Sequence, residues 1–169
     1  EQDARARATN FTEVALGYDE EMALAEAARC IMCKKPTCIL GCPVEINIPA
    51  FIQAIVDRDN RKAFDVLKLD NLLPAVCGRV CPQESQCEAT CVVGHKLEPV
   101  AIGRLERNVG HVGLEAGWKE KIEITENGHK VAIIGSGPGG IACAADMAKA
   151  GCDVTIYEAL HTAGGVLKY

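Results

Sequence analysis

Eight of the ten cysteines fall into two short clusters with related spacing. Thiolates bind iron–sulfur clusters and zinc, and thiols pair as disulfides in oxidising compartments, so the spacing has to distinguish three chemistries. The two clusters read Cys30-x2-Cys33-x4-Cys38-x3-Cys42-Pro43 and Cys77-x3-Cys81-Pro82-x4-Cys87-x3-Cys91.

The spacing favours iron–sulfur clusters over zinc and disulfides. Zinc prefers two close cysteine pairs per tetrahedral site, and only Cys30 and Cys33 are two residues apart. Disulfides need an oxidising compartment, and the N-terminal residues show no secretory signal. Both cysteine segments contain Cys-Pro. In ferredoxins with two iron–sulfur clusters, the cysteine before Pro ligates the iron–sulfur cluster that the other cysteines of its segment do not bind. We therefore expect two iron–sulfur clusters that share ligands across both segments, with a zinc-stabilised interaction module as the alternative.

The residues alone leave one ligand position open between Cys77 and Glu106. Cys77 can ligate, or it can be a buried apolar thiol, as free cysteines often are. Glu106 interrupts an apolar helical face, where a carboxylate is costly unless it is paired or bound to a metal. Its alternative role is an ion pair with one of three nearby arginines, Arg79, Arg104 or Arg107.

A second chemical motif is the glycine-rich turn at 135–140, where Gly135, Gly137 and Gly140 form G-x-G-x-x-G. It follows a predicted strand and opens a predicted helix, and Glu158 ends the next strand. Glycines at this spacing let a pyrophosphate approach the helix N-terminus, and the acidic residue can bind a ribose hydroxyl. The turn therefore predicts a dinucleotide-binding Rossmann site.

Helices and loops must position the cysteines. Asp19 predicts an N-cap, Pro49 a first helical turn, and Asn60 the cap of a further short helix. A helix starting near Pro99 would carry Ile102, Leu105, Glu106, Val109 and Gly113 on one face. The cysteine segments 30–43 and 77–91 are predicted to be loops.

From residue 130 the pattern changes to strand, helix and strand, which is the βαβ opening of a Rossmann domain. Only eleven residues follow Glu158, so we expect this domain to be incomplete. The predicted organisation has an N-terminal extension at 1–18, extended over a neighbouring surface or disordered, and a mainly α iron–sulfur domain at 19–114. A linker at 115–129 and the start of the Rossmann domain at 130–169 complete it.

Composition limits the functional classes. Hydrophobic residues make up 49% of the chain and charged residues 24%, as in globular proteins, and no apolar run is long enough for a membrane span. The net charge is 18 − 23 = −5, with basic residues scattered, which argues against nucleic-acid binding. We expect a soluble, cytoplasmic protein.

The chain resembles the small (beta) subunit of NADPH-dependent glutamate synthase and its superfamily. This superfamily also includes the N-terminal part of dihydropyrimidine dehydrogenase, sulfide dehydrogenase and the large subunit of NADH-dependent ferredoxin:NADP oxidoreductase. The resemblance rests on residues 28–43, 77–82, 100–107 and 131–138.

This resemblance implies an α-helical ferredoxin-like domain with two [4Fe-4S] clusters, followed by Rossmann domains for FAD and for NADPH, the latter absent here. By position it implies that Glu106 joins Cys30, Cys33 and Cys38 on one cluster, and that Cys77 does not bind metal. The other implied ligands are Cys42, Cys81, Cys87 and Cys91. Gly164 and Gly165 match the second glycine pair of these flavoproteins and so assign the Rossmann start to FAD.

The implied activity is that of an NAD(P)H-dependent oxidoreductase. Electrons would pass from NADPH through FAD and the clusters to a partner, the glutamate synthase large (alpha) subunit or an equivalent electron acceptor. There, glutamine and 2-oxoglutarate would become glutamate. Other members of the superfamily remain alternatives, and we expect residues 1–169 by themselves to be inactive.

Overall fold

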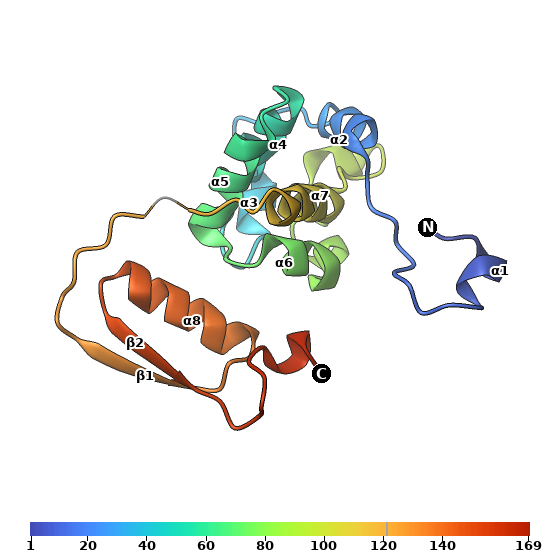
Figure 1. Ribbon diagram of the computed structural model, residues 1–169. Coiled ribbons are helices and arrows are strands. Elements are labelled where there is room, and N and C mark those ends of the chain that lie inside the picture. The colour runs from blue at the N-terminus through green and yellow to red at the C-terminus, as the bar shows by residue number, and fades with distance from the viewer. Residues whose placement is uncertain (121) are drawn as a thin grey trace. The chain divides into compact units, whose positions relative to one another are not determined.

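The computed structural model describes residues 1–120 and 122–169 and divides them into two compact units, Glu1–Trp118 and Lys119–Tyr169 (Figure 1). The linker predicted at 115–129 includes residue 121, which lies outside the described residues.

The first unit is helical, which confirms the predicted fold class. No strand occurs among its described residues, and two short 3-10 turns, Gln83–Ser85 and Val92–His95, complete it. Its helices are α1 (Ala4–Arg7), α2 (Glu20–Ala27), α3 (Thr37–Leu40), α4 (Ile48–Val56), α5 (Asn60–Asp70), α6 (Pro74–Val80) and α7 (Ile102–Glu115).

Local capping explains where these helices begin. The Asp19 side chain accepts a hydrogen bond from the Met22 amide at 2.8 Å, so Asp19 caps α2 as predicted. The predicted cap at Asn60 was wrong by one residue, because Asp59 accepts from the Lys62 amide at 2.9 Å and Asn60 is already helical. Pro49 lies in the first turn of α4, as expected of a residue without an amide hydrogen.

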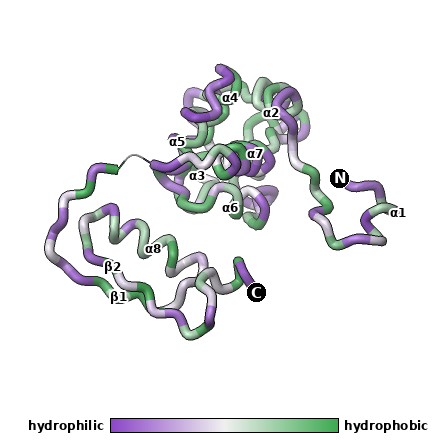
Figure 2. The backbone as a smooth tube through the Cα atoms, in the orientation of Figure 1, coloured by the Kyte–Doolittle hydropathy of each residue, from purple (hydrophilic) through white to green (hydrophobic). Residues whose placement is uncertain are grey.

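The core of this unit lies between α2, α4, α5 and α7. Its large side chains include Phe51 and Ile52 from α4, Leu67 from α5, and Leu105 and Val109 from α7, none more than 1% exposed. The face predicted for the helix starting near Pro99 is confirmed in α7, because all five residues predicted to lie on it are buried. Hydrophobic and hydrophilic residues alternate along these helices accordingly (Figure 2).

Helices α6 and α7 pack with their backbones in contact. A Cβ atom added to Gly78 would lie 2.4 Å from the Arg107 backbone nitrogen, and one added to Gly110 would lie 2.5 Å from the Ala75 nitrogen. Only glycine permits so close an approach. As a result α6, which carries Cys77, lies directly against α7, which carries Glu106.

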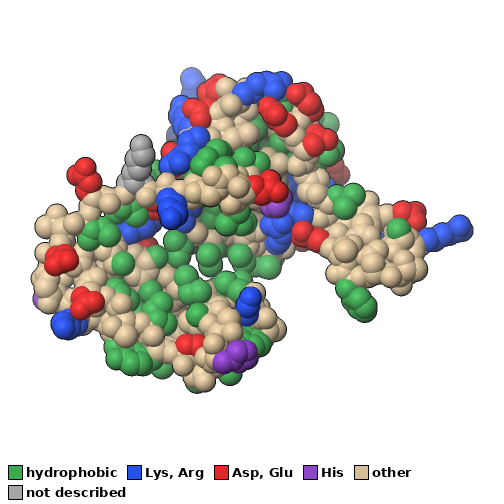
Figure 3. Space-filling view, in the orientation of Figure 1, with side chains coloured by type: hydrophobic (Ala, Val, Ile, Leu, Met, Phe, Trp, Pro, Cys, Tyr) green, Lys and Arg blue, Asp and Glu red, His purple; other side chains and the backbone are tan. Residues whose placement is uncertain are grey.

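The second unit is the predicted βαβ start. Strands β1 (Lys130–Ile134) and β2 (Asp153–Tyr157) pair in parallel, with Lys130 opposite Asp153, and α8 (Pro138–Lys149) contacts both strands. A final 3-10 turn spans Gly165–Leu167. Exposed apolar side chains gather on this unit (Figure 3), among them Ile134, Ile156, Tyr157, Leu160 and Val166.

None of the described helices is both long enough and apolar enough to cross a membrane.

Candidate metal centre and nucleotide-binding turn

All ten cysteines are free thiols, and the two cysteine segments are less irregular than predicted. Segment 30–43 contains α3, which carries Cys38, and segment 77–91 starts inside α6, with Cys77 helical and Cys81 as C-cap. The prediction of plain loops was therefore wrong. Pro74 can start a helix because its missing amide hydrogen is not needed there, and Pro82 ends it by disfavouring helical geometry at Cys81.

The first group of thiols comprises Cys30, Cys33, Cys38 and Cys91, which line one cavity. Its other walls are mostly apolar and include Ile48, Ile52, Val93, Val100 and Ile102. Burial raises the pKa of Cys30, and burial together with the neighbouring Cys30 and Cys91 raises that of Cys38 to about 11. A bound cation would favour the thiolates that these apolar surroundings disfavour.

Two threonines bring the chain segments of this group together. The Thr37 hydroxyl donates to the Thr90 carbonyl at 2.5 Å, and the Thr90 hydroxyl donates back to the Thr37 carbonyl at 3.1 Å. Each threonine directly precedes a cysteine, so the pair holds Cys38 and Cys91 near each other. Our sequence analysis did not single out these threonines, although the repeated Thr-Cys dipeptide is a visible signal.

The second group comprises Cys42, Cys77, Cys81, Cys87 and Glu106. Burial raises the pKa of Cys77, raises that of Cys81 to about 11 and raises that of Cys87 to about 12. The charges of Glu106 and Cys42 are among the causes of all three raised pKa values, which places these side chains near one another.

The structure thus brings together every predicted metal-ligating residue, but in a grouping that differs from the one the resemblance implied. Cys91 lies with Cys30, Cys33 and Cys38, whereas Glu106 lies with Cys42, Cys81 and Cys87. Compared with the implied grouping, Cys91 and Glu106 each belong to the other group. The threonine pair holds Cys91 beside Cys38, and the packing of α6 on α7 holds Glu106 beside the α6 cysteines. Among the described residues, no three His, Cys, Asp or Glu side chains are arranged around a single-ion site.

Glu106 is only 6% exposed, and burial raises its pKa to about 7. None of the three arginines considered as its partners pairs with it. Arg79 and Arg107 bind Glu13 instead, at 2.7 and 3.1 Å, and Arg104 lies over the Tyr18 ring. Within the described chain, the carboxylate has only one hydrogen-bond donor, the Asn71 amide at 2.6 Å. A buried carboxylate without a counter-charge is the environment of a metal ligand or a protonated acid.

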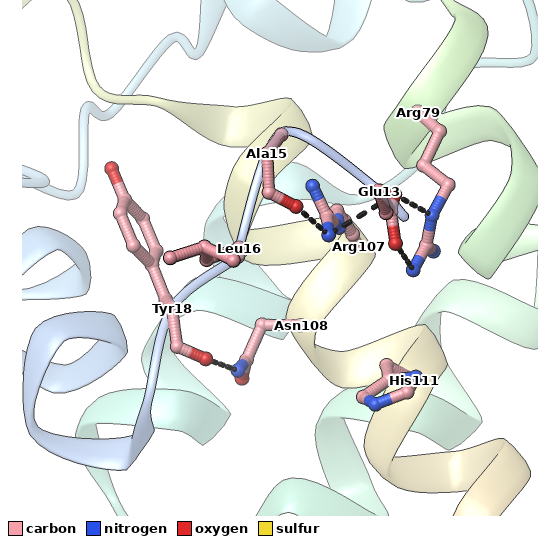
Figure 4. A pocket seen from close by; sticks show the side chains of 9 residues that line it. Glu13, Ala15, Leu16, Tyr18, Arg79, Arg107, Asn108 and His111 are labelled. Atoms are coloured by element: carbon pink, nitrogen blue, oxygen red, sulfur yellow. Dashed lines mark hydrogen bonds and ion pairs between the residues drawn. The ribbon is translucent and has the colours of Figure 1, made fainter. Parts of the chain in front are cut away.

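Residues 13–18 of the N-terminal extension lie over α6 and α7 around a pocket of about 180 Å³ (Figure 4). Glu13 bridges Arg79 and Arg107, the Ala15 carbonyl accepts from Arg107 at 2.6 Å, and the Tyr18 carbonyl accepts from Asn108 at 2.8 Å. For residues 13–18, these contacts support the first of the two expectations for the extension, that it lies along a neighbouring surface, whereas Ala4–Arg7 form the helix α1, which was not predicted. The contacts of residues 13–18 also explain why the arginines are not available to Glu106.

The glycine-rich turn lies between β1 and α8, with Gly137 as the N-cap of α8. A Cβ atom on Gly140 would lie 2.0 Å from the Gly135 carbonyl oxygen, so only glycine fits there. Glu158 accepts hydrogen bonds from the Ser136 amide and hydroxyl and from the Leu160 amide, which lower its pKa to about 2.

The second glycine pair closes onto the same turn. The Gly164 amide donates to the Ser136 hydroxyl at 3.0 Å, and a Cβ atom on Gly165 would lie 2.9 Å from Gly137 Cα. All six predicted nucleotide-binding residues are therefore neighbours. Our sequence analysis did not single out Ser136, which is 1% exposed and joins the two glycine segments through Glu158 and Gly164.

Comparison with known protein families gives one match to each unit. Residues 7–118 match the family described as dihydropyrimidine dehydrogenase domain II, 4Fe-4S cluster. Residues 133–168 match the NAD(P)-binding Rossmann-like domain.

Similar curated proteins are oxidoreductases or their subunits. The chain is 34% identical to the small chain of Escherichia coli glutamate synthase [NADPH] over 98% of its own length and 35% of that protein. It is 34% identical to the E. coli putative oxidoreductase UacF over 98% of its length and 26% of that protein. It is 35% identical to PreT, an E. coli NAD-dependent dihydropyrimidine dehydrogenase subunit, over 92% of its length and 38% of that protein. The chain thus spans between about a quarter and two fifths of these relatives.

Proposed function

Since the chain belongs to the family of dihydropyrimidine dehydrogenase domain II, 4Fe-4S cluster, we propose that its helical unit holds two [4Fe-4S] clusters for electron transfer. The first ligand set is Cys30, Cys33, Cys38 and Cys91, and the second is Cys42, Cys81, Cys87 and Glu106. When bound, such clusters accept and release single electrons at potentials that their ligands and surroundings adjust. The iron–sulfur family match favours this proposal over a zinc module.

One observation carries the proposal: among the described residues, seven cysteines without disulfides and one buried carboxylate without a counter-charge gather in two groups. The thiols of the first group meet at a mostly apolar cavity and form no disulfide. Glu106 is buried beside three cysteines without a counter-charge among the described residues. Cluster iron would supply the positive charge that both groups lack.

We further propose that the second unit is the start of an FAD site. Gly137 at the N-terminus of α8, where an added Cβ would meet no atom within 4 Å, leaves room for a pyrophosphate, and the Glu158 carboxylate can accept hydrogen bonds from ribose hydroxyls. The second glycine pair, Gly164 and Gly165, supports FAD over NADPH at this turn. The family description itself names NAD(P).

In the whole protein, we propose that electrons pass between NADPH-reduced FAD and an electron-accepting partner subunit, as in glutamate synthase. The identity to the glutamate synthase small chain supports this choice. A role in dihydropyrimidine reduction is the second candidate, favoured by the similarity to PreT. The free cysteines support our placement of the protein in the reducing cytoplasm.

The test is a reductive titration of the anaerobically purified chain, followed by electron paramagnetic resonance. The proposal expects two centres that each take up one electron per chain. A chain that takes up no electrons and contains neither iron nor acid-labile sulfide holds no such clusters, and the proposal would then be wrong.

A further inference from the structure

Asn71 is one of the few buried polar residues of the helical unit, at 8% exposure, and it ends α5. Its side-chain amide makes three hydrogen bonds. The nitrogen donates to Glu106 Oε1 at 2.6 Å, and the oxygen accepts from the Leu73 amide at 2.9 Å and from Cys77 Sγ at 3.4 Å. Because a backbone amide only donates and a carboxylate only accepts, these neighbours fix which end of the amide faces which.

Asn71 therefore contacts both candidates for the eighth ligand. It occupies one carboxylate oxygen of Glu106, and the other oxygen accepts no hydrogen bond within the described chain. On the opposite side of the amide, the Asn71 oxygen accepts a hydrogen bond from the Cys77 thiol. An iron ligand must be a thiolate, which has no proton to donate.

We propose that Asn71 is a positioning residue that presents the Glu106 carboxylate to the second cluster and holds Cys77 away from it. The inference rests on the proposed ligand set. Cysteine is the usual ligand of these clusters, so a carboxylate beside an available cysteine needs a reason. The amide supplies it, because one side chain orients the oxygen ligand and engages the competing sulfur.

The alternative is that Asn71 only shapes the chain between α5 and α6 through its bond to Leu73. The variant Asn71→Ser separates the two roles. A serine hydroxyl can still accept from the Leu73 amide in a local turn, but it is too short to reach both Glu106 and Cys77. Asn108→Ser is the matched control, since Asn108 is half-buried on the helix of Glu106 and, among the described residues, its side chain donates only to the Tyr18 carbonyl.

The experiment compares anaerobically purified wild type, Asn71→Ser, Asn108→Ser, Cys77→Ala and the double variant Asn71→Ser/Cys77→Ala. Iron per chain, the paramagnetic resonance spectrum after reduction and the midpoint potential of each cluster are measured. We expect Asn71→Ser to keep its iron but to change the spectrum and potential of the second cluster, as Cys77 replaces Glu106. The double variant should lose about half its iron, whereas Cys77→Ala and Asn108→Ser should match wild type.

An Asn71→Ser protein with the wild-type spectrum and potentials would overturn the proposal. The proposal would also be wrong if Cys77→Ala changed the iron content by the same amount in the wild-type protein and in Asn71→Ser. If Asn71→Ser lost both clusters through misfolding, Asn71→Thr replaces it, because threonine suits the extended backbone at this position and keeps a hydroxyl acceptor for the Leu73 amide, but is too short to reach both Glu106 and Cys77. Wild-type features in that variant would overturn the proposal too.

Glu106→Ala in the same series distinguishes this inference from the proposed ligand set. If the wild type holds two clusters and Glu106→Ala changes neither, the ligand set is wrong. If Glu106→Ala loses the second cluster while the Asn71 variants keep wild-type features, only the role of Asn71 is wrong.

Discussion

At the scale of single residues, Cys91 and Glu106 distinguish the two possible groupings of ligands. The resemblance to the glutamate synthase superfamily implied that Cys91 ligates together with Cys42, Cys81 and Cys87. In the structure, Cys91 instead lines the cavity of Cys30, Cys33 and Cys38. The two groupings predict opposite results for pairs of substitutions.

We expect the pair Cys33→Ala/Cys91→Ala to keep about half of the wild-type iron, since both residues then serve the same four-iron cluster. The pair Cys81→Ala/Cys91→Ala should lose nearly all of it, because each substitution removes a ligand from a different cluster. Iron per chain measured on anaerobically purified variants checks both. The reverse pattern would restore the grouping that the resemblance implied.

The sequence indicates the candidate ligands but not which of them lie together. Spacing and Cys-Pro identify the cysteines, and Glu106 is conspicuous as the one carboxylate on an apolar helical face. The grouping depends on hydrogen bonds between Thr37 and Thr90, 53 residues apart in the chain, and on the burial of Asn71 beside Glu106. Such contacts follow from tertiary packing, which no local pattern encodes.

At the scale of elements, the contact between α6 and α7 determines where Glu106 meets the cysteines of α6. We expect Gly78→Ala to force the helices apart, because its Cβ would lie 2.4 Å from the Arg107 backbone nitrogen. Overpacking of this kind costs about 1–3 kcal/mol of stability. Denaturant unfolding, followed by cluster absorbance, should show a lower midpoint. Gly94→Ala is the control, since its Cβ would approach no atom closer than 3.4 Å, and an equal loss in both variants would contradict this account.

The N-terminal segment should leave α6 and α7 at acid pH. The hydrogen bond from Arg79, with the nearby Arg107 charge, lowers the pKa of Glu13 below its ordinary value, 4.5. A lowered pKa in the folded state means that this attachment stabilises the protein above pH 4.5 and is lost as pH falls through the folded value. The carboxylate is half exposed, so the contribution is about 1 kcal/mol or less.

The amide chemical shifts of residues 13–18, followed by nuclear magnetic resonance from pH 7 to pH 3, check this expectation. Glu13→Gln should show the low-pH shifts throughout the range, because its amide cannot form the ion pairs. Identical titrations of wild type and variant would show that Glu13 does not hold the segment.

Most elements could be predicted from periodicity and capping residues, as with Asp19 before α2 and the apolar face of α7. The helix around Cys77 was missed because the cysteine spacing was interpreted as a loop, although Pro74 and Pro82 are ordinary start and stop signals. The short α3 is the opposite case. Four residues are too few to show a helical period.

For the whole molecule, the two proposed sites lie in separate compact units, so a substitution in one unit should leave the other site intact. Gly140→Ala places a Cβ 2.0 Å from the Gly135 carbonyl, so we expect the flavin to be lost while the iron remains. Gly139→Ala is the control, because its Cβ would meet no atom within 4 Å. The molar ratio of flavin to iron, measured on the whole protein after purification from cells that make it naturally, checks this expectation for both variants. Loss of iron along with flavin would contradict the independence of the units.

Metal analysis decides whether the helical unit holds two four-iron clusters. Iron, zinc and acid-labile sulfide are measured per chain on protein purified without oxygen. We expect about eight irons with matching sulfide and no stoichiometric zinc. One or two zinc ions per chain without sulfide would contradict this expectation, and the cysteine groups would then form a structural zinc module.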